Sequence, residues 1–522
     1  MLDLAKVRGL ADVARVQAKS YGERTAFIFE DRRVSFNAMD AATNRLAQRL
    51  RQEGVAPQDR VAVLAKNSDV FYELWFGAMK ARVCLAPVNF RLAPPEIAYI
   101  LKDARAKILF VGADFYDLAE KAVAELDPKP RIISLDGPRG DWSDYGAWRD
   151  QAEAVDPNLD LPADDDVIQL YTSGTTGNPK GVQLSNANYL AFLRLAEHVA
   201  GFDYRDDETV LNAMPLFHVG GANPGLAGYA AGSTVLILKD IVLVPLLDLI
   251  AREKVNHAFL VPAVILMLIN TPEIARADLS SMRTVAYGAS PIAQETLQRA
   301  QKLFGCDFLQ FYGMTETVGA GTYLPPEGHD PARRKLRSCG IPWPGIAVKV
   351  VDAHENEVPQ GEVGEIVIKA PIVMKGYWNN PEATAEAVRD GWMHTGDAAY
   401  QDADGYFFIY DRVKDMIVTG GENVYPAEVE NAVFGHPAVA DVAVIGVPDD
   451  KWGEAVKAIV VLKPGAAADA ASIIAWAREK VATYKAPRSV DFVETIPRNP
   501  SGKVLRRELR KPFWEGRERM VG

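Results

Sequence analysis

Short apolar runs alternate with helical patterns through the first two-thirds of this chain, and no other feature constrains its fold more. VAVLAKN at 61–67 precedes VFYELWFGAMKA at 70–81, and AKILFVGA at 106–113 precedes FYDLAEKAVAEL at 115–126. Strands that alternate with helices form parallel sheets covered by helices, because the chain must cross the sheet between neighbouring parallel strands. We therefore predict an α/β fold for this part of the chain.

The pattern changes after residue 336. From Arg337 to Tyr410 short alternating stretches (AVKVVD, GEIVIKA, GYFFIYD) are separated by turn residues, which is typical of antiparallel or barrel-like structure. After Asp411 two strand-like runs, VADVAVIGV and AVKAIVVL, are followed by the helical pattern ASIIAWAREKVA. We predict a large N-terminal domain over 1–411, with two helix-covered, mainly parallel sheets and a small β-barrel-like subdomain at 337–410, and a mobile α+β C-terminal domain over 412–522.

Composition and charge narrow the function. The chain has 522 residues, 48% of them hydrophobic and 24% charged, which is the balance of a soluble globular protein. Its net charge of −11 argues against a nucleic-acid binder, because phosphate backbones attract clustered Lys and Arg. An anionic ligand must therefore find local positive charge.

Cysteines and apolar runs indicate the compartment. The 3 cysteines, Cys84, Cys306 and Cys339, are widely spaced and form no disulfide framework or CxxC metal site, so we expect a reducing cytoplasm. The run from Ala258 to Ile269 contains Pro262 and is shorter than the ~20 residues of a membrane span. We expect no transmembrane segment; peripheral membrane contact and a homodimer stay open.

The segment YTSGTTGNPKGV at 171–182 follows an apolar strand candidate and precedes a helical pattern that begins near Ser185. A strand, a Gly/Ser/Thr loop and a helix can present backbone N–H groups and hydroxyls to phosphate oxygens, while Lys180 supplies charge. The segment does not match the Walker pattern, because Pro179 stands before Lys180, and it contains no GxGxxG. By itself it is more typical of a surface loop.

Further segments in a fixed order decide between these interpretations: NAMPLFHVGG (212–221), YGASPI (287–292), QFYGMTET (310–317), WMHTGD (392–397), DRVKDMIVTGGENVYPAEVE (411–430) and PRNPSGKVLRREL (497–509). Together with YTSGTTGNPKGV they resemble the ATP-dependent adenylate-forming enzymes and, within them, the acyl-CoA synthetases. The resemblance spans nearly the whole chain. It implies that a small-molecule carboxylic acid attacks ATP to give acyl-AMP and pyrophosphate, and that coenzyme A then displaces AMP.

The resemblance implies a set of nucleotide-binding residues. The loop would hold the phosphates, Tyr312 would lie against adenine, Thr315 on the α-phosphate, Glu316 on Mg²⁺, and Asp397 with Arg412 on the ribose. The full set is Thr172, Ser173, Gly174, Thr175, Thr176, Gly177, Lys180, Gly288, Ala289, Ser290, Gln310, Phe311, Tyr312, Gly313, Met314, Thr315, Asp397, Arg412 and Lys503. Taken singly, an aromatic after a strand is usually core and a lone Glu is usually solvated.

Lys503 in SGKVLRREL is implied as the main catalytic residue of the adenylation step, with Thr315, Glu316 and His218 as further catalytic candidates. Its ammonium would sit between the attacking carboxylate and the α-phosphate. The plainer explanation is that Lys503 belongs to a basic surface run with Arg506 and its neighbours. GASPI is no nucleophile elbow, since Ile292 stands where GxSxG has its second glycine.

The remaining implied residues concern the thiol and the acid. Lys414 would be the pivot of the C-terminal domain, and Gly420, Gly421 and Glu422 would line the coenzyme A tunnel, although paired glycines are more often a hairpin turn. His218 is given a gating or positioning role, since a lone histidine among apolar residues is more often a core group. The acyl pocket would consist of His218, Gly220, Gly221, Asn223, Gly319, Ala320 and Gly321.

PLFHVGGANPG contains no aspartate to pair with a substrate ammonium, so we expect an acid with an uncharged tail. Medium- to long-chain fatty acids rank first and aryl or alicyclic acids second. A luciferase-like oxygenase and a carrier-protein acyl loader retain the same adenylation residues and stay as rivals. A nucleotide-binding regulatory protein is disfavoured, because Lys503, Glu316 and Asp397 are all present.

Overall fold

The computed structural model describes residue 4 and residues 7–172, 179–290, 292–412, 415–419, 422–449, 452–481, 483–498 and 504–515. The chain packs into two compact units, Met1–Val348 with Ile368–Met393 and Lys349–Val367 with His394–Gly522. Each unit is described by itself. This division falls within the segment 337–410, and the predicted domain boundary after residue 411 stays a prediction.

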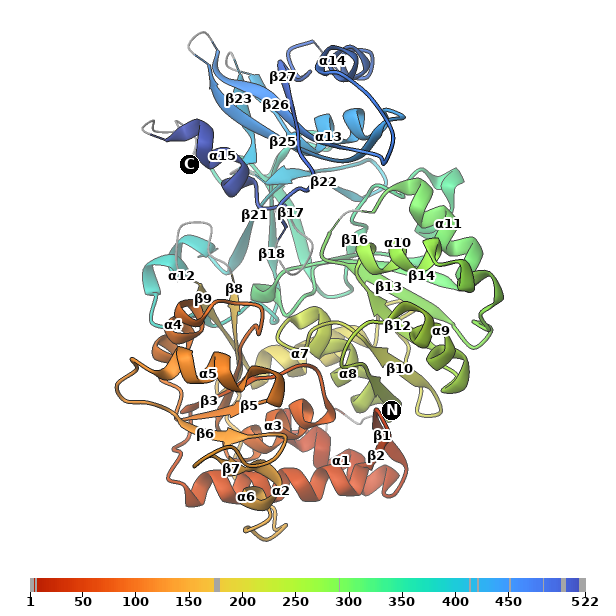
Figure 1. Cartoon of the computed structure of the whole chain (residues 1–522). Coiled ribbons are helices and arrows are strands. Elements are labelled where there is room, and N and C mark those ends of the chain that lie inside the picture. Colours follow the sequence, from red (N-terminus) through yellow and green to blue (C-terminus); the bar gives the residue numbers. More distant parts are fainter. Residues whose placement is uncertain are drawn as a thin grey trace. The chain divides into compact units, whose positions relative to one another are not determined.

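The larger unit contains an eight-stranded sheet of order β19-β9-β8-β4-β3-β5-β6-β7 (Figure 1). From β8 to β7 neighbouring strands pair in parallel, whereas β9 pairs antiparallel with both β8 and β19. The strands are β3 Arg60–Leu64, β4 Cys84–Pro87, β5 Ile108–Val111, β6 Arg131–Ser134, β7 Ser143–Asp144, β8 Asp166–Thr172, β9 Lys180–Ser185 and β19 Gly376–Tyr377. The associated helices are α2 Phe36–Gln52, α3 Asp69–Lys80, α4 Pro94–Ala104, α5 Tyr116–Val123 and α6 Tyr145–Arg149. The two strand-and-helix pairs predicted between residues 61 and 126 are confirmed as β3–α3 and β5–α5.

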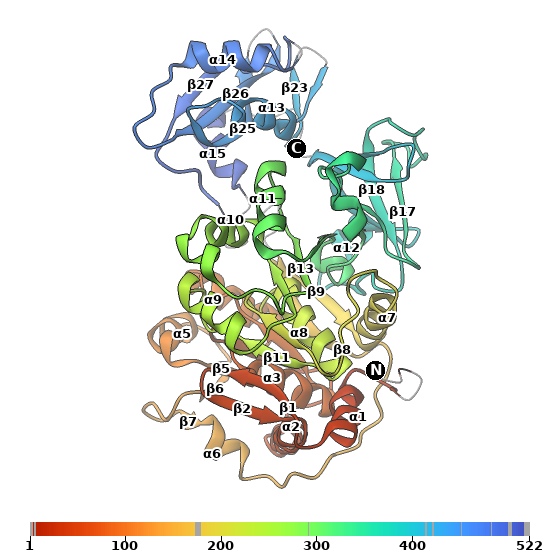
Figure 2. The same ribbon diagram turned by 90° about the vertical axis from the view of Figure 1, so that its right-hand side faces the viewer.

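A nine-stranded sheet of the same unit has the order β16-β15-β14-β13-β12-β10-β11-β1-β2. Its central strands pair in parallel and only the edges are antiparallel. The strands are β1 Thr25–Phe29, β2 Arg32–Ser35, β10 Thr209–Asn212, β11 Thr234–Ile237, β12 His257–Leu260, β13 Thr284–Gly288, β14 Asp307–Tyr312, β15 Thr322–Leu324 and β16 Ile341–Pro342. Further helices of this unit are α1 Ala11–Tyr21, α7 Asn186–Ala196, α8 Val219–Ala231, α9 Leu243–Arg252, α10 Pro262–Asn270 and α11 Gln294–Phe304, of which α10 and α11 lie side by side (Figures 1 and 2). The predicted pair of helix-covered, mainly parallel sheets is confirmed.

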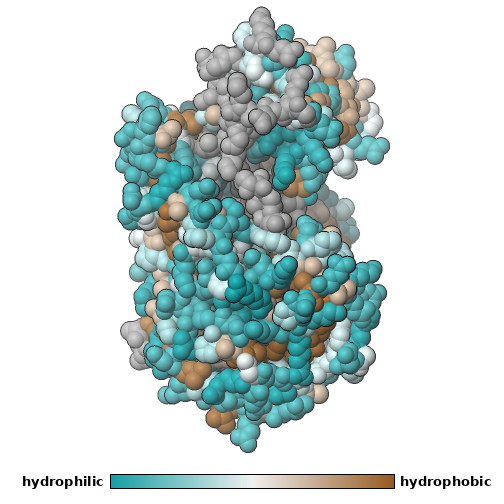
Figure 3. All heavy atoms as spheres, turned by 90° about the vertical axis from the view of Figure 1, so that its left-hand side faces the viewer, coloured by the Kyte–Doolittle hydropathy of each residue, from teal (hydrophilic) through white to brown (hydrophobic). Residues whose placement is uncertain are grey.

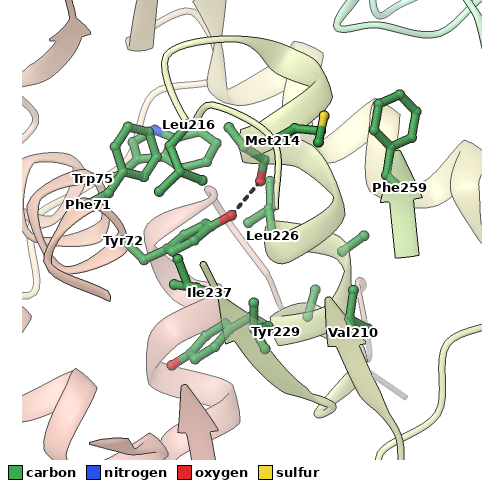
Figure 4. Close-up of a cluster of buried hydrophobic side chains, with 14 of the residues drawn as sticks. Phe71, Tyr72, Trp75, Val210, Met214, Leu216, Leu226, Tyr229, Ile237 and Phe259 are labelled. Atoms are coloured by element: carbon green, nitrogen blue, oxygen red, sulfur yellow. Dashed lines mark hydrogen bonds between the residues drawn. The ribbon is translucent and has the colours of Figure 1, made fainter. Parts of the chain in front are cut away.

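Aromatic side chains from α3 and α8 form the centre of the core of this unit. Figure 4 shows Tyr72 of α3 close to Leu226 of α8, with its hydroxyl directed toward that helix. The buried Tyr72 hydroxyl donates to the carbonyl oxygen of Ala222 at 2.9 Å, so its polar group is satisfied inside apolar surroundings. This contact fixes the first turns of α8, where the predicted acyl pocket begins.

The predicted β-rich segment contains a sheet of order β17-β18-β21-β20 with β22 paired to β21. Its strands are β17 Ala347–Val351, β18 Gly364–Lys369, β20 Val388–Arg389, β21 Trp392–Gln401 and β22 Phe407–Arg412. Short 3₁₀ turns of the larger unit are η2 Ala113–Phe115, η3 Pro272–Arg276, η4 Thr315–Thr317, η5 Pro326–His329 and η6 Pro331–Arg333.

The C-terminal part of the chain is an α+β layer structure, as predicted. Its sheet has the order β24-β23-β26-β25 with β27 paired to β26. The strands are β23 Ile417–Thr419, β24 Glu422–Val424, β25 Val439–Asp449, β26 Gly453–Leu462 and β27 Ser489–Phe492, and the helices are α13 Pro426–Phe434, α14 Ala470–Arg478 and α15 Arg506–Trp514. A separate apolar core, including Val429, Val444 and Ile473, joins α13 and α14 to this sheet.

The surface shown in Figure 3 is mostly hydrophilic, with hydrophobic side chains in small scattered patches. Within the described ranges, every helix is too short or too polar to cross a membrane.

Candidate functional site

The glycine- and threonine-rich loop connects two antiparallel strands. Thr172 at the end of β8 lies opposite Lys180 at the start of β9, so the two ends of the loop are neighbours. Residues 173–178, which include the predicted Ser173, Gly174, Thr175, Thr176 and Gly177, lie outside the described residues. The structure therefore places the two ends of the predicted phosphate loop and leaves its centre as a prediction.

The helix expected near Ser185 is confirmed, and a strand that the sequence analysis did not predict precedes it. Helix α7 begins at Asn186, and Ser185 is its N-cap; the six residues of β9 stand between the loop and the helix. At ~3.3 Å per residue the helix N-terminus is about 20 Å along the strand from the loop. KGVQLS forms a strand because β8 and β19 flank it on both sides, a pairing that the sequence does not reveal.

A lysine, a tyrosine and a glutamate meet beside this hairpin. The ammonium of Lys180 lies 4.9 Å from the centroid of the Tyr377 ring, and the Tyr377 hydroxyl donates to Oε1 of Glu316 at 2.8 Å. Burial, followed by the Glu316 charge, raises the pKa of Tyr377, so the phenol keeps the proton that it donates. The predicted phosphate-binding lysine and the predicted metal-binding carboxylate thus share one contact residue, which sequence reasoning missed.

The turn that carries Thr315 and Glu316 depends on glycine. At Gly313 a Cβ atom would come within 2.5 Å of the backbone of Gly319, and the Gly319 N–H donates to the carbonyl oxygen of Met314 at 2.8 Å. The chain therefore folds back on itself within a few residues after β14. Glu316 is 6% exposed and Thr315 is half-buried, at the carboxyl end of the sheet's strand β14.

The predicted adenine wall lies at the ends of adjacent parallel strands. Gly288 of β13 is opposite Phe311 of β14, and a Cβ at Gly288 would come within 2.5 Å of the Phe311 carbonyl oxygen. Ala289 has a φ of +67°, in the left-handed region, so the chain turns sharply there. Ser290, Gln310 and Tyr312 are half-buried at the same edge. Carboxyl ends of parallel strands are the usual place of ligand sites in such sheets.

A histidine supports this wall from the protein interior. The Nδ1 atom of His329 donates to the carbonyl oxygen of Pro325 at 2.9 Å, which leaves Nε2 to accept from the Tyr287 hydroxyl at 3.1 Å. Burial lowers the pKa of His329 to about 4, so the ring is neutral at pH 7. Sequence reasoning missed His329, because only the fold brings it behind β13.

The predicted acyl-pocket residues come from two places in the chain. Asn223 of α8 donates through Nδ2 to the carbonyl oxygen of Val318 at 2.7 Å, which joins the start of α8 to the segment with Gly319, Ala320 and Gly321. A side chain at Gly220 would approach the Phe259 ring to 3.2 Å, and one at Gly319 would approach Val219 to 3.3 Å. The structure therefore brings the two predicted pocket segments together.

The local structure by itself also accounts for the residue types at positions 218 and 221. His218 is the N-cap residue of α8, and burial, with a smaller contribution from Arg91, lowers its pKa to about 4. A Cβ at Gly221 would lie 2.1 Å from the carbonyl oxygen of Pro215, so the backbone fold alone requires glycine there. A neutral His218 fits a positioning role. Its contact with substrate stays a prediction.

The second unit holds the predicted ribose-binding pair on adjacent strands. Asp397 of β21 lies opposite Arg412 of β22, and the Asp397 N–H donates to the Thr395 hydroxyl at 3.1 Å. Lys414, Gly420, Gly421 and Lys503 lie outside the described residues, and Glu422 is placed only as the first residue of β24. The roles predicted for these residues stay predictions.

Comparison with known proteins assigns the chain to a family. Residues 14–378 match the model of the AMP-binding enzyme family, and residues 428–503 match that of the AMP-binding enzyme C-terminal domain. The chain belongs to the AMP-binding enzyme family. The predicted resemblance to adenylate-forming enzymes is thereby confirmed.

Relatives within the AMP-binding family differ in their acids and acceptors. The chain is 40% identical over 95% of both chains to the fatty acid–[acyl-carrier-protein] ligase ScoC of Streptomyces coeruleorubidus. It is 38% identical to the feruloyl-CoA synthase of Amycolatopsis sp., over 92% of this chain and 94% of the relative. The solved Mycobacterium tuberculosis fatty acyl CoA synthetase has a TM-score of 0.78 and 33% identity, over 97% of this chain and 98% of that one.

The AMP-binding assignment gives the Lys180–Tyr377–Glu316 cluster a chemical meaning. Mg²⁺ prefers oxygen ligands and is commonly held by one or two carboxylates together with substrate phosphates. In the part of the chain that the structure describes, no group of three or more His, Cys, Asp or Glu side chains is placed to hold a metal ion. The buried Glu316 carboxylate, beside the predicted phosphate loop, has the ligand chemistry for a magnesium ion that is shared with a nucleotide.

Proposed function

We propose that this chain is an AMP-forming acid–thiol ligase. A carboxylate oxygen of the acid would attack the α-phosphorus of ATP and release pyrophosphate, giving an acyl-adenylate. The thiol sulfur of coenzyme A would then attack the acyl carbon, releasing AMP and giving the thioester. The observation that carries this proposal is the approach of Lys180 and Glu316 to one tyrosine beside a hairpin whose loop is rich in glycine and hydroxyls.

The chemistry explains why such groups are needed. An anionic nucleophile must approach a polyanion, so cations and donors fixed where charge develops contribute most of the rate. Lys180 and the loop hydroxyls would hold the β- and γ-phosphates, Thr315 would donate to the α-phosphate, and Glu316 would hold Mg²⁺, which screens the phosphate charge. Gly288 and Tyr312 would enclose the adenine at the carboxyl ends of β13 and β14, where Gly288 lies opposite Phe311.

The C-terminal part would complete the site. Asp397 would accept hydrogen bonds from the ribose hydroxyls and Arg412 would contact the ribose or a phosphate. Lys503 would stabilise charge in adenylation, and rotation about Lys414 would replace it by the Gly420–Gly421–Glu422 segment for thioester formation. The support is the motif order together with the position of Asp397 opposite Arg412 on adjacent strands.

For the acid we propose a medium- to long-chain fatty acid. Gly220 and Gly319 present no side chain beside Phe259 and Val219, so this part of the predicted pocket is lined by apolar groups. His218 is neutral, because its pKa is about 4, and therefore would not pair with a charged tail. The relatives named above include ligases of fatty acids, which is consistent with this choice.

One observation favours an aryl acid as the second candidate. The Oδ1 atom of Asn223 is buried and accepts no hydrogen bond from any described residue. Its Nδ2 atom is committed to Val318, so Oδ1 is an acceptor. A hydroxyl or ring N–H on an aryl acid would satisfy it, whereas an alkyl chain would not.

A panel of acids with ATP, Mg²⁺ and coenzyme A tests the proposal, with the product identified by mass. A fatty acyl-CoA with stoichiometric AMP is the expected product. If the acyl group is transferred only to an added carrier protein, the acceptor is that protein and not coenzyme A. Oxygen uptake without coenzyme A would indicate a luciferase-like reaction. If no organic acid yields AMP, the proposal falls.

We also place the enzyme in the cytoplasm. Cys84, Cys306 and Cys339 are all free, which fits a reducing compartment.

A further inference from the structure

The backbone on both sides of Tyr377 holds this residue against the hairpin of β8 and β9, which carries the proposed phosphate loop and is called the phosphate-loop hairpin below. Strand β19 forms the third strand beside β9, with Tyr377 opposite Val182, and the Trp378 N–H donates to the Gly181 carbonyl oxygen at 2.7 Å. Helix α12 (Pro381–Ala387) starts directly afterwards with Asn380 as N-cap, accepting from the Ala383 N–H. The tyrosine therefore has little freedom to move relative to Lys180.

Two hydrogen bonds connect this segment to Glu316. The Tyr377 hydroxyl donates to Oε1 at 2.8 Å, and the Met374 N–H donates to the Glu316 carbonyl oxygen at 2.8 Å. Tyr377 is 9% exposed and Glu316 is 6% exposed, so solvent competes little for this contact. A hydrogen bond that a neutral donor makes to a buried carboxylate orients that carboxylate.

The ring of Tyr377 serves the other partner. The Lys180 ammonium lies 4.9 Å from the ring centroid, within the range in which an aromatic face attracts a cation. Lys180 is the first residue of β9 and stands opposite Thr172. The hydroxyl and the ring of one side chain thus contact the proposed metal ligand and the proposed phosphate-binding cation.

We propose that Tyr377 is a positioning residue of the adenylation site: its hydroxyl holds the Glu316 carboxylate in the orientation that ligates Mg²⁺, and its ring places the Lys180 ammonium. This inference rests on the proposed function, because it assumes a magnesium nucleotide at the hairpin. Residues that hydrogen-bond a metal ligand from behind tune metal affinity, and their loss typically costs about 10–100-fold.

The experiment measures nucleotide binding by calorimetry, separately from catalysis. The probe is α,β-methylene-ATP, titrated in Mg²⁺ and in EDTA into the wild type and into Tyr377→Phe. Phenylalanine keeps the ring and removes the hydroxyl. We expect the gain in affinity that Mg²⁺ provides to fall by about tenfold or more, while affinity in EDTA changes by less than about twofold.

A matched control removes a buried tyrosine hydroxyl elsewhere. Tyr145, the first residue of helix α6, is 3% exposed and donates to Oε1 of the buried Glu73 at 2.5 Å. Helix α6 follows β7, which is at the opposite edge of the sheet from β9 and β19. Tyr145→Phe should leave the Mg²⁺ gain unchanged, although it loses a comparable hydrogen bond. Thermal unfolding of both variants separates loss of folding from loss of metal affinity.

Two further variants complete the test. With Glu316→Gln the metal ligand is absent, so adding Tyr377→Phe should change the Mg²⁺ gain no further. Tyr377→Leu also removes the ring and should lower affinity in EDTA by about 2–5-fold through Lys180.

The outcomes distinguish the two levels of the proposal. If Mg²⁺ raises the nucleotide affinity of the wild type and of Tyr377→Phe by the same factor, the role of Tyr377 is overturned and the proposed function stays intact. A wild type that binds no nucleotide and yields no AMP with any acid removes the proposed function, and this inference with it.

Discussion

A buried carboxylate at the base of the β8–β9 hairpin allows a stability prediction of defined size. In β8, Asp166 Oδ2 lies 2.6 Å from Nη2 of Arg60, with exposed fractions of 2% and 4%, and its Oδ1 lies 2.8 Å from Nζ of Lys375. Asp166→Asn leaves the Arg60 charge buried without its counter-charge, which costs about 3–5 kcal/mol. Lys375 is 37% exposed, so solvent limits the loss of the second pair.

The expected shift in melting temperature follows from the size of the unit. At ~2.1 cal/mol/K per residue, the roughly 370 residues of the larger unit have an unfolding entropy of about 0.8 kcal/mol/K. A loss of about 4 kcal/mol therefore lowers the melting temperature by about 5 °C. Scanning calorimetry of the wild type and Asp166→Asn measures this shift.

The neighbouring aspartate provides the control. Asp165 Oδ2 lies 2.7 Å from Nε of Arg82, whose side chain is 28% exposed. After Asp165→Asn water still solvates Arg82, so the cost is about 1 kcal/mol and the shift about 1 °C. Equal shifts for the two variants would refute the reasoning that burial of the partner arginine sets the cost.

The remaining predictions concern catalysis, pH and packing. Lys503→Ala should slow acyl-adenylate formation by on the order of 10²-fold while thioester formation from supplied acyl-adenylate survives, because only adenylation needs that charge; half-reaction kinetics would contradict this by showing equal losses. The pKa of His329 is lowered to about 4 by burial, so between about pH 6.5 and pH 4 the unfolded chain binds a proton that the native chain does not, and stability falls as pH falls. His329→Gln should therefore reduce the stability lost between pH 7 and pH 5 by roughly 2 kcal/mol in urea unfolding, and an unchanged pH slope would disprove the assignment. Gly221→Ala should cost about 1–3 kcal/mol, since its Cβ would lie 2.1 Å from the Pro215 carbonyl oxygen, whereas Gly435→Ala, with its nearest atom at 3.5 Å, should be close to neutral in the same unfolding assay.

The fold was largely predictable because its signals are local. Alternating apolar runs and helical periods around β3, α3, β5 and α5 depend only on which residues are near in sequence. The short strand β9 was missed for the opposite reason. KGVQLS forms a strand only where β8 and β19 supply partners on both edges, and β19 is almost 200 residues away in the chain.

The candidate site divides in the same way. Motifs identified Lys180, Glu316 and the glycines of the turns, whose backbone requirements are visible in sequence as residue types. They did not identify Tyr377, His329 or Phe259, because each acts through a contact between elements distant in the chain.

Local periodicity and motif order are enough to predict the α/β architecture and the family of adenylate-forming enzymes, because both are read from residues that are neighbours in the chain. Contacts between distant segments become visible only in the folded chain: Tyr377 of β19 contacts both Lys180 and Glu316, and a neutral His329 supports the strand end beside Gly288. These contacts cannot be read from the sequence, because hydrogen bonds and ring contacts depend on distances of a few ångströms. Sheet pairing and turn geometry across the whole unit set those distances.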